Sequence, residues 1–149
     1  MSPRYLLLVA EGETDWRELL DRLGRRTALT LAFENGRFAV FVNAACRCLG
    51  AGERACVIGT LFHRHGLAQP IAGLSTSEAD SIVETNGAAL LRRFWGGYLA
   101  AVASADLVRI IRDPSGTFPC YFARGAGCVA FASDAELPGP VRRCLAGQL

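Results

Sequence analysis

The sequence predicts an α+β domain of antiparallel strands, with helices between two groups of strands. The chain has 149 residues, of which 51% are hydrophobic, and this suits one domain with a substantial core. Short apolar runs typical of strands occur before and after a segment with helical signals. The connections between the later runs are too short for parallel crossovers, which need about a dozen residues or more, so these strands must be antiparallel.

The first part of the chain is predicted to form four strands and one helix. The helix covers residues 14–25, because Trp16, Leu19 and Leu23 recur at helical spacing, and Gly24 is the expected stop. Asn35-Gly36 is a strong signal for a hairpin turn between the two middle strands. The predicted strands are residues 5–10, 28–33, 38–42 and 56–62.

The second part is predicted to form two helical segments and four strands. Ser75 and Glu78 have the spacing of a capping box, which opens a helix to about Asn86, and Gly87 ends it before a further helical turn at residues 88–94. Asp113 begins an Asp-Pro-Ser-Gly tight turn. The predicted strands are residues 98–103, 107–112, 118–122 and 128–132, and a helix or tail follows from residue 134.

The composition argues against several classes of function. All 16 basic residues are arginine, so a Schiff-base lysine, a phosphate-loop lysine and a lysine base are impossible. A net charge of +2 gives no indication of a nucleic-acid partner. No apolar run approaches the roughly 18 residues of a membrane span, and no signal peptide is convincing, so we expect a cytoplasmic protein.

Six cysteines are expected to be reduced in that compartment. Cys46 and Cys48, combined with His63 and His65, can be drawn as a zinc site, but the paired Cys-x2-4-Cys spacing is missing. We therefore expect no metal in this chain and interpret most of the thiols as small hydrophobic side chains. The cysteines are Cys46, Cys48, Cys56, Cys120, Cys128 and Cys144.

Four segments in the later part of the chain carry a family resemblance. They are residues 94–102 (FWGGYLAAV), 107–116 (LVRIIRDPSG), 118–122 (FPCYF) and 129–137 (VAFASDAEL). Their order and spacing resemble the end of the class II glutamine amidotransferase domain of asparagine synthetases, and residues 56–63 add a weaker match. The resemblance implies an N-terminal-nucleophile (Ntn) hydrolase-like αββα sandwich of two antiparallel sheets flanked by helices.

The residues that would make such a domain a glutaminase have changed. The family uses an N-terminal cysteine whose α-amine is the base, whereas this chain begins Met1-Ser2-Pro3. The family's glutamine-binding strand carries Asn and Glu where this chain has Ile58 and Thr60, with Gly59 retained between them. An apolar Ile58 cannot replace an amide that must pair with a polar substrate. We expect no catalytic residue and a vestigial glutamine pocket near Ile58, Gly59 and Thr60.

The resemblance implies a non-catalytic domain of an ATP-dependent amide-forming enzyme. β-Lactam synthetases and the macrolactam cyclases of lasso-peptide biosynthesis lack the N-terminal cysteine, and a short, arginine-rich domain resembles the cyclases more. The expected partners are an ATP-binding synthetase domain, which is absent from this chain and would use ATP and Mg, and a precursor peptide. We expect the isolated chain to expose an apolar docking face and to form a homodimer or a poorly soluble monomer.

Two alternative functions follow from the same residues. Removal of Met1 would expose Ser2 as the nucleophile of an active amidohydrolase, although Pro3 removes a backbone N–H where the family has glycine. The chain can also be interpreted as a free-standing protein-binding module that docks another enzyme.

Other residues have both a chemical and a structural interpretation. His63 and His65 have the composition of a base or ligand pair, but their position at a strand end favours an exposed loop edge. Trp95 and Tyr98 have the character of ligand-stacking groups, but aromatic residues in a strand are more often core.

Charged residues are subject to the same choice. The pair Arg92 and Arg93 and the pair at residues 142–143 suit a phosphate or partner site, but the pattern favours solvated helix faces. Asp113 has the chemistry of a catalytic carboxylate, but its place in a tight turn already explains it.

Overall fold

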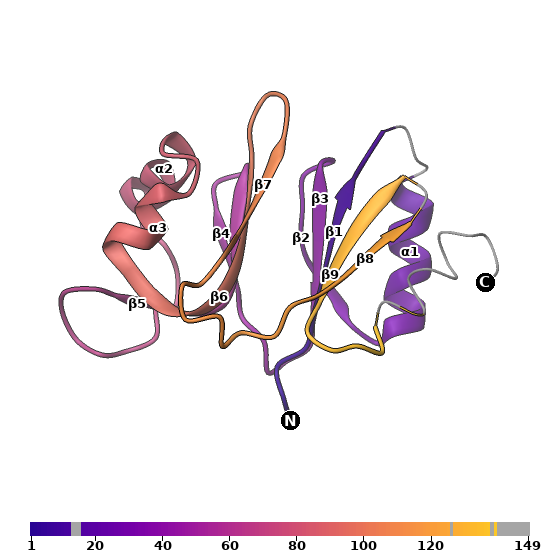
Figure 1. Ribbon diagram of the computed structural model, residues 1–149, viewed down its shortest axis with the longest axis horizontal. Helices are drawn as coiled ribbons and strands as arrows, with labels where there is room; N and C mark the ends of the chain where they lie inside the picture. Colours follow the sequence, from indigo (N-terminus) through magenta and orange to yellow (C-terminus); the bar gives the residue numbers. More distant parts are fainter. Residues whose placement is uncertain (13–15, 126, 138, 140–149) are drawn as a thin grey trace. The chain divides into compact units, whose positions relative to one another are not determined.

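The computed structural model describes residues 1–12, 16–125, 127–137 and 139, and it has an α+β fold with two antiparallel sheets (Figure 1). The described residues confirm the predicted antiparallel α+β class. The chain divides into two compact units, Met1–Cys46 with Pro119–Leu149, and Arg47–Phe118. Among the described residues, no helix is long and apolar enough to cross a membrane.

The first unit contains a five-stranded sheet in the order β2-β3-β1-β9-β8. Strand β1 lies at its centre and pairs antiparallel with β3 on one side and β9 on the other, so that Leu6 is opposite both Phe41 and Ala132. The strands are β1 (Tyr5–Ala10), β2 (Thr30–Glu34), β3 (Phe38–Val42), β8 (Tyr121–Gly125) and β9 (Cys128–Ala132).

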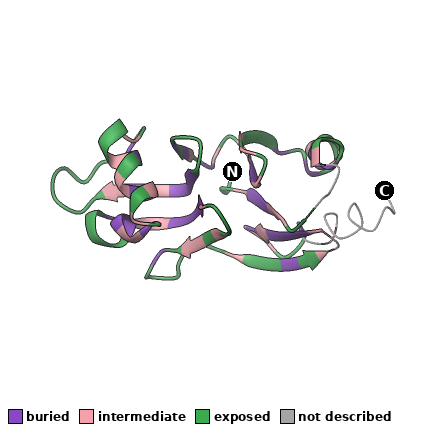
Figure 2. Cartoon of the chain, turned by 90° about the horizontal axis from the view of Figure 1, so that it is seen from above, coloured by how far each residue is buried: buried purple, intermediate pink, exposed green. Residues whose placement is uncertain are grey.

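Helix α1 (Trp16–Thr27) covers one face of this sheet (Figure 1). Leu19, Leu20 and Leu23 form its buried stripe and pack on a cluster that includes Leu6 and Leu8 of β1. Figure 2 shows the same helix with its opposite side exposed. The strand therefore buries alternate residues under the helix, as the period of two requires.

The predicted end of this helix at Gly24 was wrong, because the helix continues to Thr27. The Thr27 hydroxyl donates a hydrogen bond to the Leu23 carbonyl at 2.7 Å, and the next residue, Ala28, has φ 57° and leaves the helix. The hairpin turn at Asn35-Gly36 is confirmed. Its Asn35 side chain accepts hydrogen bonds from the backbone N–H groups of Arg37 and Phe38.

The second unit contains a four-stranded sheet in the order β4-β5-β6-β7 and two helices. The strands are β4 (Cys48–Ala51), β5 (Ala55–His63), β6 (Phe94–Ala103) and β7 (Val108–Arg112). The helices are α2 (Thr76–Glu84) and α3 (Ala88–Arg93). The capping box at Ser75 and Glu78 is confirmed, with both reciprocal hydrogen bonds present.

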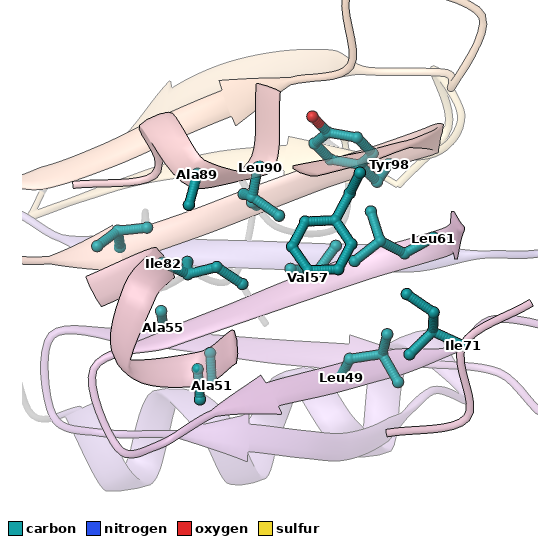
Figure 3. Close-up of a cluster of buried hydrophobic side chains, with 14 residues drawn as sticks. Leu49, Ala51, Ala55, Val57, Leu61, Ile71, Ile82, Ala89, Leu90 and Tyr98 are labelled. Atoms are coloured by element: carbon teal, nitrogen blue, oxygen red, sulfur yellow. The ribbon is translucent and has the colours of Figure 1, made fainter. Parts of the chain in front are cut away.

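Both helices cover one face of the four-stranded sheet. Figure 3 shows Ile82 of α2 and Ala89 and Leu90 of α3 facing Val57 of β5, in a cluster that also contains the aromatic ring of Tyr98. Helix α2 ends at Glu84 rather than at the predicted Asn86.

The structure differs from the sequence prediction at strands β4 and β8. Strand β4 was not predicted. It pairs with β5 through a hairpin whose loop, residues 52–54, begins at Gly52 with φ 64°. The strand predicted at residues 118–122 instead covers Tyr121–Gly125. It also belongs to a different sheet from β7, so the short Asp113 turn does not join two paired strands.

Strands β5 and β6 form the longest pairing of the structure, with nine residue pairs from Ala55–Val102 to His63–Phe94. Two glycines permit their close approach. A Cβ at Gly96 would collide with the Thr60 carbonyl oxygen, and a Cβ at Gly59 would collide with the Gly97 carbonyl oxygen. Both glycines also have positive φ, 144° and 114°, which L-residues rarely adopt.

We predict that Gly96→Ala lowers the free energy of unfolding by about 2–4 kcal/mol, because both the backbone conformation and the approach of β5 exclude a side chain. Urea denaturation measures this change. Gly73→Ala is the matched control, since a Cβ there meets no atom within 4 Å, and it should change stability by less than about 0.5 kcal/mol. Equal stability of the two variants would contradict the prediction.

Candidate functional site

The residues expected at a vestigial glutamine pocket lie in the middle of β5. Ile58 is fully buried, Gly59 is buried, and Thr60 is partly exposed. Ile58 and Thr60 point to the same face of the strand, since side chains alternate, and this is the face opposite α2 and α3. Gly59 donates its N–H to the Arg47 carbonyl at 2.9 Å.

Neighbouring strands place two thiols on the same face as Ile58. In the register of β4 and β5, Cys48 lies directly opposite Ile58, and Cys56 precedes Ile58 by two residues. On the other side, Leu99 of β6 lies opposite Ile58. Together with Thr60, these residues give the face five positions that present thiol, aliphatic and hydroxyl groups. None of the five carries a carboxylate, an amide or an imidazole.

The two thiols hydrogen-bond to each other. This bond lowers the pKa of Cys48, against the opposing effect of burial. The same bond, together with burial, raises the pKa of Cys56 well above its ordinary value. Cys48 is the partly exposed member and Cys56 the buried one. This pair could not be predicted from the sequence without β4, for which a hairpin turn at Gly52 was the available signal.

Ser2, the alternative nucleophile, belongs to the first unit and is exposed. Its carbonyl accepts a hydrogen bond from Asn43 Nδ2 at 2.9 Å. The Oδ1 atom of the same Asn43 side chain accepts a hydrogen bond from the Arg4 N–H at 3.0 Å. Among the described residues, Ser2 lies outside every regular element. The backbone before β1 is thus tied to the residue that follows β3.

The motif at residues 129–137 has a structural role in this unit. The Ser133 hydroxyl accepts a hydrogen bond from the Tyr5 N–H at 3.0 Å. Asp134 accepts a hydrogen bond from Arg4 Nε at 3.1 Å and also caps the turn to Leu137. These residues hold the start of β1 in place, so the motif has a structural role here.

Asp113 has the predicted turn role. Its Oδ1 accepts hydrogen bonds from the Gly116 N–H at 3.0 Å and from the Ser115 hydroxyl. Its other oxygen, Oδ2, is buried and has no hydrogen-bond partner among the described residues. Asp113 N–H donates to the Tyr98 carbonyl, and the Tyr98 hydroxyl is also buried, with no hydrogen-bond partner in the part of the chain that the structure describes. Burial and the nearby Asp113 raise the pKa of Tyr98.

His63, one of the candidate residues, pairs with the carboxylate of Glu78. His63 Nε2 lies 2.6 Å from Glu78 Oε2, so one carboxylate serves both this pair and the capping box. Burial by itself would raise the pKa of Glu78, but the hydrogen bonds from Ser75 and His63 lower it.

Tyr98 belongs to the core, as predicted. Trp95 is 49% exposed and stacks on Phe62, so its assignment to the core was wrong.

The remaining candidates lie at the surface or outside the described residues. His65, Arg92 and Arg93 are exposed, as expected of a loop edge and a solvated helix face. The second arginine pair, residues 142–143, and Cys144 fall outside the described residues. Among the described residues, no three potential ligands gather into a metal site; Cys48 contacts Cys56, and His63 contacts Glu78.

The comparisons with known proteins add no assignment. No protein-family model, no curated protein and no solved structure matches this chain.

We predict that Cys56→Ala slows alkylation of Cys48 by iodoacetamide several-fold near neutral pH. Loss of the hydrogen bond raises the pKa of Cys48 and reduces its thiolate fraction. Peptide mass spectrometry after timed alkylation measures the rate. Cys128→Ala removes a buried thiol of the other unit, whose pKa is raised to about 11, and should leave the Cys48 rate unchanged.

We also predict opposite effects for two buried tyrosines. Tyr98→Phe should raise the free energy of unfolding by about 1 kcal/mol, because it removes a hydroxyl without a partner. Tyr5→Phe should lower it by about 1 kcal/mol, because the Tyr5 hydroxyl donates to the Pro119 carbonyl at 2.6 Å. Chemical denaturation measures both, and a destabilised Tyr98→Phe variant would contradict the prediction.

Proposed function

We propose that this chain is a non-catalytic, glutaminase-like domain of an asparagine-synthetase-like enzyme that forms amides or lactams with ATP, of the lasso-peptide cyclase type. The observation that carries the proposal is the face around Ile58. A glutamine pocket needs polar groups for the substrate's amide and amino-acid ends, and this face offers a buried aliphatic side chain there.

The proposed fold is the Ntn-type αββα sandwich. Its support is the pattern of each sheet considered alone. Leu6 and Leu8 of β1 belong to the same hydrophobic cluster as the α1 leucines, while Leu7 on the other face of β1 is also apolar and buried. In the second unit, Val57 belongs to the cluster under the helices, and Ile58 on the opposite face is buried as well. A sheet with one helix-covered face and a second apolar face suits a two-sheet sandwich.

The division of labour follows from this chemistry. In the proposed enzyme, a partner ATP-binding domain uses ATP and Mg to activate a carboxylate, and an amine already present in the substrate captures it. Ammonia from glutamine is then unnecessary, which accounts for an apolar Ile58. The present chain serves as a scaffold for that partner domain and helps to hold the precursor peptide.

We predict that the purified chain releases no ammonia from glutamine above the buffer rate, and that Ser2→Ala behaves identically. Mass spectrometry of the mature N-terminus must accompany the assay, so that the exposed residue is known. Ammonia release that Ser2→Ala abolishes would establish the amidohydrolase and overturn the proposal.

Association with a synthetase domain is the positive test. A separately produced asparagine-synthetase-like ATP-binding domain from the same biosynthetic system should co-purify with this chain. Light scattering of the chain alone should reveal a homodimer or larger species, because the docking face is uncovered. A chain that stays monomeric and does not bind the synthetase domain would contradict the scaffold role.

A further inference from the structure

Two adjoining hollows lie on the second unit, one where the turn between α2 and α3 meets β7 and the other between α2 and α3. One has a volume of about 350 Å³ and is lined by residues that include Gly87, Leu91 and Arg109. The other, of about 230 Å³, is lined by residues that include Arg92 and Arg93. Because Thr85 lines both, we treat them as one groove, called here the α2–α3 groove.

The α2–α3 groove is basic. Its lining residues include three arginines, Arg92, Arg93 and Arg109, and no aspartate or glutamate. All three are exposed, and none has an ion pair with another described residue. The whole chain, by contrast, has nearly equal numbers of basic and acidic residues, 16 and 14. The groove therefore concentrates unpaired positive charge.

Apolar side chains share the groove with these charges. Leu91 is 44% exposed, and Ile111 of β7 lines the same hollow. The backbone between the helices makes room for them. Asn86 and Gly87 both have positive φ, 51° and 88°, and a Cβ at Gly87 would collide with the Ile111 side chain. Gly87 thus lets the Ile111 side chain lie against the turn between the two helices.

We propose that the α2–α3 groove binds an acidic peptide segment of another protein, with carboxylates on the arginines and an apolar side chain between them. Guanidinium groups bind carboxylates through paired, charge-assisted hydrogen bonds. Arginines line both hollows, so one small anion would engage only part of the groove. An extended peptide places residues i, i+2 and i+4 on one side, and thereby offers acid, apolar and acid groups together. This inference does not depend on the proposed function.

The test is fluorescence anisotropy of the full chain with a labelled peptide that contains Glu-Ser-Leu-Ser-Glu. We expect saturable binding, and we expect a peptide with Gln in both Glu positions to bind roughly tenfold more weakly. The triple variant Arg92→Gln/Arg93→Gln/Arg109→Gln should lose affinity by about tenfold or more. Circular dichroism verifies its fold, and Arg109→Gln alone should lose about threefold if the triple variant does not fold.

A charge-matched variant separates site binding from general attraction. Arg25→Gln/Arg26→Gln/Arg54→Gln removes the same charge from exposed residues outside the groove and should change affinity by less than about twofold. Three results would overturn the proposal: equal losses in the two triple variants, equal binding of the Gln peptide, or displacement of the labelled peptide by inorganic phosphate at the same concentration as by unlabelled peptide.

Discussion

The close contact between β5 and β6 is the constraint on which the second unit depends. The strands pair over nine residues, and two positions, Gly59 and Gly96, admit no side chain. This contact fixes the register, which in turn places Val57 under the helices and Ile58 on the other face. A shift by one residue would exchange the two faces. The apolar character of the candidate site is therefore tied to the same pairing that supports the hydrophobic cluster of this unit.

Sequence patterns predicted the strongly periodic and well-capped elements. Strands β1, β3 and β9, the Asn35-Gly36 turn and the capping box at Ser75 were found because their signals are local. Strand β4 was missed, because Cys48–Ala51 is four residues long and lacks β-branched residues. Helix α1 continues beyond Gly24, because the burial of its leucines stabilises the helix by more than the low helix propensity of one glycine destabilises it. The change of sheet between β7 and β8 has no local signal, since it follows from long-range pairing.

Only part of the candidate site could be predicted from the sequence. Ile58 and Thr60 stand where the family that the sequence resembles has polar residues, and the strand register places both on one face. The Cys48–Cys56 contact joins two strands and requires their register, so composition alone cannot reveal it. The buried Tyr98 hydroxyl and Asp113 Oδ2 likewise emerge only from packing. Arg92 and Arg93 of the α2–α3 groove were recognised as a pair along the chain, whereas Arg109 joins them only in space.

The position of β1 has a consequence for synthesis on the ribosome. Leu6 is made before the second unit, yet one of its partners, Ala132, is made only after the entire second unit. The second unit, Arg47–Phe118, is continuous in sequence and contains all strands of its own sheet. It is therefore free to fold while the first unit still lacks two strands of its sheet. During that interval the edge of β1 that later receives β9 is open, and pairing with the edge of another nascent chain is the characteristic risk.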